Sequence, residues 1–337
     1  MNRFLHLLAI SLLLFIWTSC SKVHGLDQDC EEITVALNIN GDFAVEVDQD
    51  PLTRAGSTND AYAINVYYDK EGNGTTDDIY AYGLFDNVAD MRITLLSNHK
   101  YSFRCTLVKD ARNTLFFGQA FNNTYSGYAY PFQTSSSNST MVNNAFVVGG
   151  TTYFTGFNNG NAHMAGSLSP STSNSTAYPS TNRFYGQTDN YEPIHNGVVN
   201  IYLKRVVFGA KFIVSGLTNG TMKVTCGSFA SMTFRQDGSR EGMYTFPTPV
   251  DVWKNDTPIV ASLAADYTSS WGSLWNLSQS QDIQFKRNVM TTVNIQINPD
   301  LSSASVSITE EDMDADNVIN LGINTDGLID IIVNPED

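Results

Sequence analysis

The chain has 337 residues, of which 42% are hydrophobic and 12% aromatic, and its formal net charge is −15 at pH 7. This length and composition suit two folded domains, each with its own core, and exclude a disordered tail. The acidic balance argues against nucleic-acid binding, because phosphate contacts need clustered lysine and arginine. An acidic surface of this kind suits an exported, well-solvated protein.

The first 19 residues are expected to form a signal peptide. Arg3 supplies a positive start, residues 4–16 form an apolar stretch, and Cys20 follows two small polar residues. The apolar stretch is too short to span a bilayer as a helix. The cysteine resembles that of a bacterial lipobox, which implies cleavage before Cys20 and its lipidation (palmitate), although Trp17 stands where an aliphatic residue is usual. An ordinary secretory signal with an incidental cysteine is the alternative.

Residues 33–39 alternate between apolar and polar side chains, which predicts a half-buried strand. Its apolar face would carry Ile33, Val35, Leu37 and Ile39. Residues 23–53 contain eight acids and no lysine or arginine, and Arg54 ends this run. Extended backbone there is open to a trypsin-like protease. The hypothesis is that an edge strand is removed by cleavage between Arg54 and Ala55, leaving an empty slot. A solvated loop arginine is the alternative.

Short strand-like runs continue along the chain, separated by turn residues. They are predicted at residues 61–68, 79–85, 91–96, 101–108, 115–117, 145–148, 199–203, 206–214, 222–225, 230–234, 258–263, 283–285, 289–297, 303–308, 317–323 and 328–333. No long amphipathic helix is predicted, so the fold class is all-β, with sandwiches rather than a parallel sheet covered by helices. Asn219-Gly220 predicts a hairpin between its flanking strands. Residues 167–181, rich in Ser and Thr, predict an exposed loop near a domain boundary.

The last run, residues 328–333, places Ile329, Ile331 and Val333 on one face. Left unpaired, such a strand would promote aggregation. We therefore expect it to be covered by its own sheet or by another subunit.

No catalytic residue, metal site or cofactor is predicted. The five histidines are scattered, and a glycosidase built from carboxylates alone is the enzymatic alternative. Cys105 is expected to be a buried free thiol. Acidic loops at Asp69 and Asp312 have part of an EF-hand spacing but lack the glutamate that closes it, so solvated loops are predicted. Three tryptophans are expected to pack in the core or between domains, with a sugar-stacking platform as the alternative: Trp253, Trp271 and Trp275.

The order of several short motifs resembles the fimbrillin family of Bacteroidetes-type fimbriae (type V pili). The motifs are Cys20, the first strand, Leu-Thr-Arg-Ala at 52–55, the strand at 63–69, Arg-Phe-Tyr-Gly at 183–186, Leu-Lys-Arg at 203–205 and Lys-Arg-Asn at 286–288. Each motif alone is weak, and the resemblance spans residues 20 to about 297.

This resemblance implies two transthyretin-like β-sandwich domains in tandem, at residues 55–182 and 183–337. They would follow a signal peptide (1–19) and a lipidated pro-segment with the removable strand (20–54). A donor strand would come from the tail, about residues 317–333, through Leu328, Ile329, Ile331 and Val333.

The function implied is that of a structural subunit of a cell-surface fimbria that contributes to cell adhesion. The lipid would hold the protein at the outer membrane until processing after Arg54, and strand exchange would then join it to other fimbrial subunits. Host or bacterial surface ligands are further expected partners. A fimbrial anchor that keeps its first strand and a surface glycan-binding lipoprotein are the alternatives.

Overall fold

The computed structural model describes residues 30–42, 59–111, 117–120, 124–128, 131–137, 140–158, 182–227, 232–272, 274–276, 281–299, 303–313, 321–323 and 329–331. The chain divides into two units, Met1–Glu31 and Glu32–Asp337, and the strands that the structure describes lie in the second. Within these ranges, no helix has the length and apolar character needed to cross a membrane.

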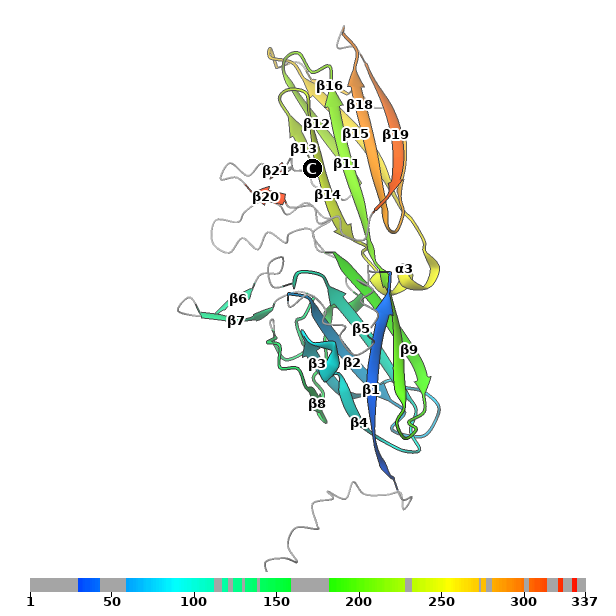
Figure 1. Ribbon diagram of the computed structural model, residues 1–337. Helices are drawn as coiled ribbons and strands as arrows, with labels where there is room; N and C mark the ends of the chain where they lie inside the picture. Colours follow the sequence, from blue (N-terminus) through cyan, green and yellow to red (C-terminus); the bar gives the residue numbers. More distant parts are fainter. Residues whose placement is uncertain are drawn as a thin grey trace, which may run out of the picture. The chain divides into compact units, whose positions relative to one another are not determined.

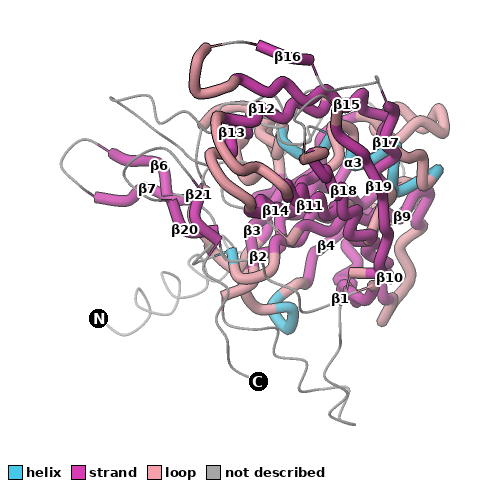
Figure 2. The backbone as a smooth tube through the Cα atoms, turned by 90° about the horizontal axis from the view of Figure 1, so that it is seen from above, coloured by secondary structure: helices cyan, strands magenta, loops and turns pink. Residues whose placement is uncertain are grey.

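The first sheet has eight strands in the order β4-β1-β10-β9-β5-β2-β3-β8 (Figures 1 and 2). Its strands are β1 (Glu32–Gly41), β2 (Ala61–Tyr68), β3 (Asp78–Phe85), β4 (Arg92–Leu96), β5 (Tyr101–Val108), β8 (Phe146–Val148), β9 (Arg183–Tyr191) and β10 (Val198–Arg205). One core cluster contains side chains of both β1 and β2, so the two halves of this sheet fold over a shared core. Two 3₁₀ turns, η1 (Val88–Asp90) and η2 (Gly156–Asn158), lie in the loops.

Two further sheets form the second half of the fold, in the orders β14-β11-β18-β19 and β13-β12-β15-β16, with β17 also beside β15. Their strands are β11 (Val207–Ser215), β12 (Thr221–Cys226), β13 (Met232–Phe234), β14 (Gly238–Thr245), β15 (Ile259–Thr268), β16 (Leu274–Asn276), β17 (Gln281–Phe285), β18 (Val289–Ile297) and β19 (Ala304–Asp312). A short helix, α3 (Pro249–Asn255), begins with a proline, which suits a first helical turn. Side chains from β11, β12, β15 and β18 share one core.

Two short ribbons complete the described structure: β6 (Phe117–Ala120) with β7 (Thr124–Tyr128), and β20 (Leu321–Ile323) with β21 (Ile329–Ile331). The all-β class predicted from the sequence is therefore confirmed.

Strand β1 bridges two other strands and is not an edge strand. Glu32–Ala36 pair antiparallel with β4, and Ala36–Gly41 pair parallel with β10. Among the described residues, β4 has no other strand partner, and Val198–Leu203 of β10 pair with β1 alone. The prediction that this strand lies at an edge is therefore wrong: β1 lies between β4 and β10, and its main chain pairs with both.

The period-two pattern of β1 is the reason for its burial. Each apolar side chain of the alternating set is at most 6% exposed, while Thr34 and Asn38 face outward and bond to side chains of β4 and β10. The buried set is Ile33, Val35, Leu37 and Ile39. Burying four such side chains stabilises the fold by roughly 6–12 kcal/mol.

The sheet arrangement differs from the sequence expectation at two places. Asn219-Gly220 does not form a hairpin, because β11 and β12 on either side of it lie in different sheets. Gly220 has φ +72°, and the turn there carries the chain from one sheet to the other. In addition, Arg183–Arg205, which the sequence assigns to the second domain, contribute β9 and β10 to the first sheet, so the change of sheet falls at Val206.

The burial of β1 gives a first testable prediction. In the chain that retains residues 20–54, Leu37→Ala should lower the free energy of unfolding by about 2–4 kcal/mol, because it empties a core position. Thr34→Ala on the outward face is the matched control and should cost about 1 kcal/mol or less, the worth of one exposed hydrogen bond. Urea denaturation measures both, and equal losses would contradict the interior placement of β1.

Candidate functional site

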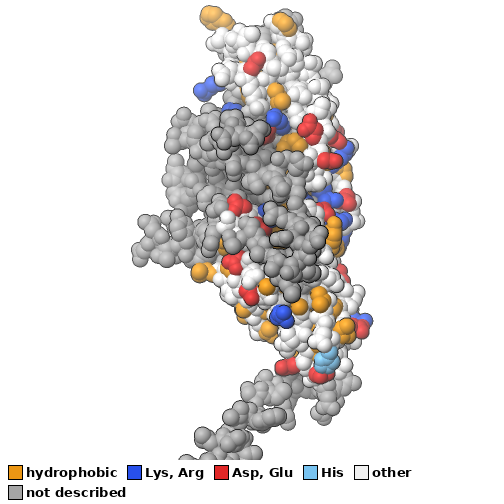
Figure 3. Space-filling model, in the orientation of Figure 1, with side chains coloured by type: hydrophobic (Ala, Val, Ile, Leu, Met, Phe, Trp, Pro, Cys, Tyr) orange, Lys and Arg blue, Asp and Glu red, His pale blue; other side chains and the backbone are white. Residues whose placement is uncertain are grey.

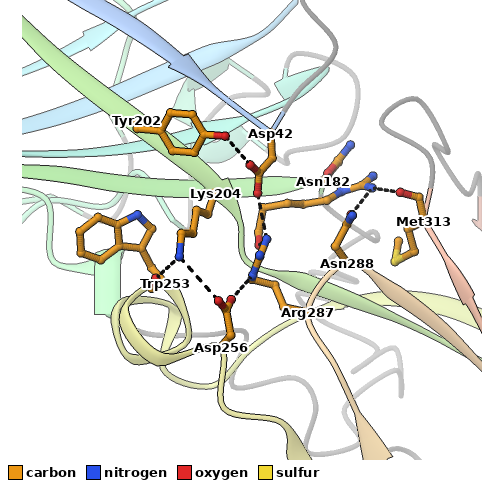
Figure 4. A network of polar contacts seen from close by, with 10 residues as sticks. Asp42, Asn182, Tyr202, Lys204, Trp253, Asp256, Arg287, Asn288 and Met313 are labelled. Atoms are coloured by element: carbon orange, nitrogen blue, oxygen red, sulfur yellow. Dashed lines mark hydrogen bonds and ion pairs between the residues drawn. The ribbon is translucent and has the colours of Figure 1, made fainter.

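The carboxylate of Asp42, directly after β1, enters a polar network that reaches the other sheets (Figure 4). Its backbone N–H donates to the Leu203 carbonyl at 2.9 Å. One carboxylate oxygen accepts from the Tyr202 hydroxyl at 2.9 Å, and the other accepts from Nη1 of Arg287, also at 2.9 Å. The end of β1 is thus held by main chain, a phenol and a guanidinium.

Arg287 lies in the turn between β17 and β18 and serves two carboxylates. Its Nε donates to Asp256, and its Nη1 also approaches the Arg205 carbonyl at 3.4 Å. Asp256 caps α3 in a left-handed conformation with φ 51°. Lys204 of β10 lies 3.6 Å from Asp256 and donates to the Trp253 carbonyl at 3.0 Å. Two acids and two bases are therefore interleaved at this junction.

The charges of this network change the pKa of two of its members. Burial alone would raise the pKa of Asp256, but the hydrogen bond and charge of Arg287, together with Lys204, hold it below its ordinary value. The hydrogen bond from Tyr202 to Asp42, and the negative charge of that carboxylate, raise the pKa of the phenol. Both shifts follow from the pairing and not from deep burial.

A second arginine, Arg205, supports the turn that carries Arg287. It is 1% exposed, and its Nε and Nη1 donate to the side-chain oxygens of Asn182 and Asn288 at 2.7 and 3.0 Å. Nη1 also reaches the Met313 carbonyl at 3.3 Å. Asn288 has φ 59° and donates its N–H to Val207 at 2.8 Å. These hydrogen bonds hold Asn288 in place and thereby fix the backbone of the preceding residue, Arg287.

Asp60 anchors the chain on the other side of the predicted cleavage position. It is 1% exposed, and its oxygens accept from Lys109 Nζ at 2.7 Å and from the Asp110 N–H at 2.8 Å. Asp60 directly precedes β2. Strand β2 therefore has its own attachment, independent of the segment that carries β1.

Most of the predicted site residues fall outside the described residues. These are Cys20, Arg54, Ala55, Leu328 and Val333. Ile329 and Ile331 lie in β21, which pairs with β20 in the register Ile323↔Ile329 and Leu321↔Ile331. Lipidation, cleavage and strand donation therefore stay predictions. The sequence analysis missed Asp42 and Arg287 as functional candidates, because two residues 245 positions apart give no local signal.

The Asp69 loop has a structural role. Asp69 is 4% exposed and accepts from the backbone N–H groups of Asn73 and Gly74 at 2.9 and 2.6 Å, so its carboxylate closes its own turn. No group of three or more potential metal ligands occurs among the described residues. Cys105 is a buried free thiol, as predicted, and burial raises its pKa.

The tryptophans separate into different environments. The Trp253 ring packs edge-on against Tyr185 at 5.8 Å, as expected for a packing role. Trp271 is 93% exposed in the turn after β15, so the packing role predicted for it is wrong. The side chain of Trp275 lies outside the described set. On the face shown in Figure 3, acidic and basic side chains are interspersed.

Comparison with known proteins gives structural matches only. No protein-family model matches the chain, and no curated protein matches it. A proposed cell adhesion protein from Bacteroides eggerthii matches with TM-score 0.39 and 13% identity, over 86% of this chain and 98% of that one. The fimbrial anchor protein Mfa2 from Porphyromonas gingivalis matches with TM-score 0.36 and 10% identity, over 84% and 98%.

The tip fimbrial protein Mfa3 from Porphyromonas gingivalis, truncated at its C-terminus, matches with TM-score 0.32 and 10% identity, over 84% of this chain and 100% of that one. The similar structures are thus cell-adhesion and fimbrial proteins, the class that the sequence resembles. These TM-scores and identities are too low to transfer a role from those proteins to this chain.

Adjacent basic residues allow a test of the Arg287 network. Arg287→Ala removes contacts to Asp42, Asp256 and a backbone carbonyl, and should lower the free energy of unfolding by about 1–3 kcal/mol. Lys286→Ala removes a more exposed pair with Glu310 and should cost about 0.5 kcal/mol. Urea denaturation of the unprocessed chain distinguishes them. A larger loss from Lys286→Ala would show that the network does not hold β1 to the second half.

The lowered pKa of Asp256 predicts a pH dependence. A carboxyl group whose folded-state pKa lies below its unfolded value stabilises the fold above that value, and the stabilisation is lost as the pH falls through the folded pKa. The melting temperature of the wild type should therefore exceed that of Asp256→Asn at about pH 6, and the gap should close below the ordinary pKa of 3.8. Calorimetry across this range is the measurement, and a gap independent of pH contradicts the pairing.

Proposed function

We propose that the chain is a structural subunit of a cell-surface fimbria, exported as a lipoprotein and polymerised by exchange of its first strand. The observation that carries this proposal is the place of β1 in the first sheet. Among the described residues, β1 alone pairs with β4 and with Val198–Leu203 of β10, and the connection from β1 to β2 contains Arg54.

The energetics favour replacement of β1 over its simple loss. Its four aliphatic side chains are worth roughly 6–12 kcal/mol, which is comparable to the whole stability of an ordinary domain. Loss of β1 would also leave the main-chain groups of two strands without partners, at further cost. A processed chain therefore needs another strand with alternating apolar side chains in the same place. Strand addition of this kind gains affinity from main-chain hydrogen bonds and specificity from side-chain pockets.

The tail is the proposed source of that strand. Residues 328–333 carry Ile329, Ile331 and Val333 at the spacing of the β1 aliphatics. The pairing of β20 with β21 covers only three residue pairs, whereas β1 has eleven. Exchange into the longer ladder is therefore favourable. A donor site at one end of the chain and an acceptor slot in the first sheet form a head-to-tail contact, which builds a filament.

Cys20 links processing to anchoring. In this proposal the lipid on Cys20 holds the new subunit at the outer membrane, because dual acylation gives stable attachment. Cleavage after Arg54 separates residues 20–54, with the lipid, from the remainder. Subunits that join the fimbria would then leave the membrane at the step that opens their slot. The assembled fimbria contributes to adhesion.

One observation favours a different function. Trp271 is 93% exposed, and an aromatic ring in that state can stack on a sugar. A surface glycan-binding lipoprotein would keep β1, stay monomeric and be retarded by polysaccharide in a native gel. An anchor subunit would also keep β1 but would bind a processed fimbrial subunit and not polysaccharide.

The proposal is tested by the N-terminal sequence of the mature surface protein and by the ladder of its polymers. The wild type should begin at Ala55 and form ladders, whereas Arg54→Ala should begin at lipidated Cys20 and stay monomeric. Arg92→Ala, in the paired strand β4, is the matched control and should behave as wild type. A wild type that begins at Cys20 and remains monomeric contradicts polymerisation through this slot.

A further inference from the structure

We propose that the incoming tail strand runs antiparallel to β10, with its Asp326 taking the place of Asp42 on Arg287 and its Gly327 taking the place of Gly41. The occupant is the segment 326–333 of a second copy of this chain. This inference rests on the proposed strand exchange and adds the direction and register of the donor, which that proposal leaves open.

The groups that would bind this acid lie at the end of the slot that β1 occupies. Removal of residues 20–54 takes away Asp42, which accepts from Arg287 Nη1 and from the Tyr202 hydroxyl, both at 2.9 Å. Asp256 still binds the Nε side of Arg287, so the guanidinium keeps its orientation. The emptied slot therefore ends in a guanidinium and a phenol that have each lost a carboxylate. A strand with an acid at this point restores both contacts.

The spacing within β1 limits where that acid must lie. Asp42 lies three residues beyond Ile39, the last buried aliphatic of β1. The tail has two acids at the same separation from its apolar run: Asp326, three residues before Ile329, and Glu336, three residues after Val333. With Asp326 the donor runs opposite to β1, and with Glu336 it runs in the same direction. Charge complementarity alone does not distinguish these registers.

The close approach of Gly41 to β10 decides between them. A Cβ added to Gly41 would lie 2.0 Å from the Leu203 carbonyl oxygen, far inside any real contact. The parallel register sets Pro335 at this position, which has a Cβ and lacks an N–H for the ladder. The antiparallel register sets Gly327 there, which has no Cβ to clash. The geometry therefore points to the antiparallel strand.

The same register fills the core positions of β1. Ile329 takes the place of Ile39, Ile331 that of Leu37 and Val333 that of Val35, so three aliphatics replace three. The outward position of Asn38, whose amide donates to Asn200 at 2.8 Å, goes to Asp330. In the parallel register, Ile332 would take this position and Asp330 that of Ala36 on the same outward face. The two registers therefore differ in which residue lies opposite Asn200.

The register can be tested by disulfide formation between a cysteine at position 200 of the acceptor chain and a cysteine in the donor peptide. The full-length chain with Asn200→Cys is digested at Arg54 in the presence of a synthetic peptide of residues 321–337. Once the peptide has displaced the cleaved leader, residues 20–54, Cys20 and Cys30 leave with it, and the remaining cysteines, Cys105 and Cys226, are buried. A peptide with Asp330→Cys should form the disulfide, and one with Ile332→Cys should not. The reverse result overturns the antiparallel register.

Fluorescence anisotropy tests the acid and the glycine, with the labelled peptide added to the processed wild-type chain after its cleaved leader, residues 20–54, has been removed. Asp326→Asn should weaken binding about five- to tenfold, as expected for a partly exposed ion pair with a charged hydrogen bond. Gly327→Ala should also weaken binding, and Glu336→Gln, the matched control, should change it less than about twofold. Weakening by Glu336→Gln but not by Asp326→Asn overturns the inference. A failure of every peptide to bind contradicts the proposed strand exchange itself, and this register with it.

Discussion

The first sheet depends on one strand, β1, which provides main-chain hydrogen-bond partners to two other strands, β4 and β10. β1 leaves β4 after Ala36 and continues along β10, so ten residues complete the main-chain pairing on both sides. Its side chains also contribute to the core that the two halves of the sheet share. Because both contributions come from β1, the first sheet and its core are complete only while a strand occupies the position of β1.

Charge, rather than apolar area, fixes the end of β1 against the second half of the fold. Arg287 stands between Asp42 and Asp256, and Arg205 beneath it binds Asn288. Adjacent Lys286 pairs with Glu310 on the surface. A guanidinium can bind two carboxylates in different directions at once, which an ammonium group does less well. We therefore expect the stability of the fold to depend more on an arginine at position 287 than on a lysine at position 286.

Strand positions were largely readable from the sequence, whereas their partners were not. β2, β5 and β18 match their predicted limits, because alternation in the sequence reflects one buried and one exposed face. β14 (Gly238–Thr245) was not predicted, since its first half lacks this alternation. The Asn219-Gly220 turn was recognised but connects two sheets, and the pairing of Asp42 with Arg287 joins distant segments. Local pattern specifies a strand, but tertiary packing chooses its neighbours.

Because β1 pairs with both β4 and β10, proteolytic cleavage of the chain and dissociation of the cleaved segment are separate steps. Hydrolysis of the peptide bond after Arg54, which lies outside β1 in the sequence, would break no hydrogen bond of β1 and would expose none of its four buried aliphatics. A nicked subunit would therefore keep its own leader as a tightly bound, non-covalent plug. The rate of filament growth would then be limited by the rate at which an incoming strand displaces the leader from β4 and β10. Cleaved monomers would accumulate before assembly begins without exposing an unpaired strand.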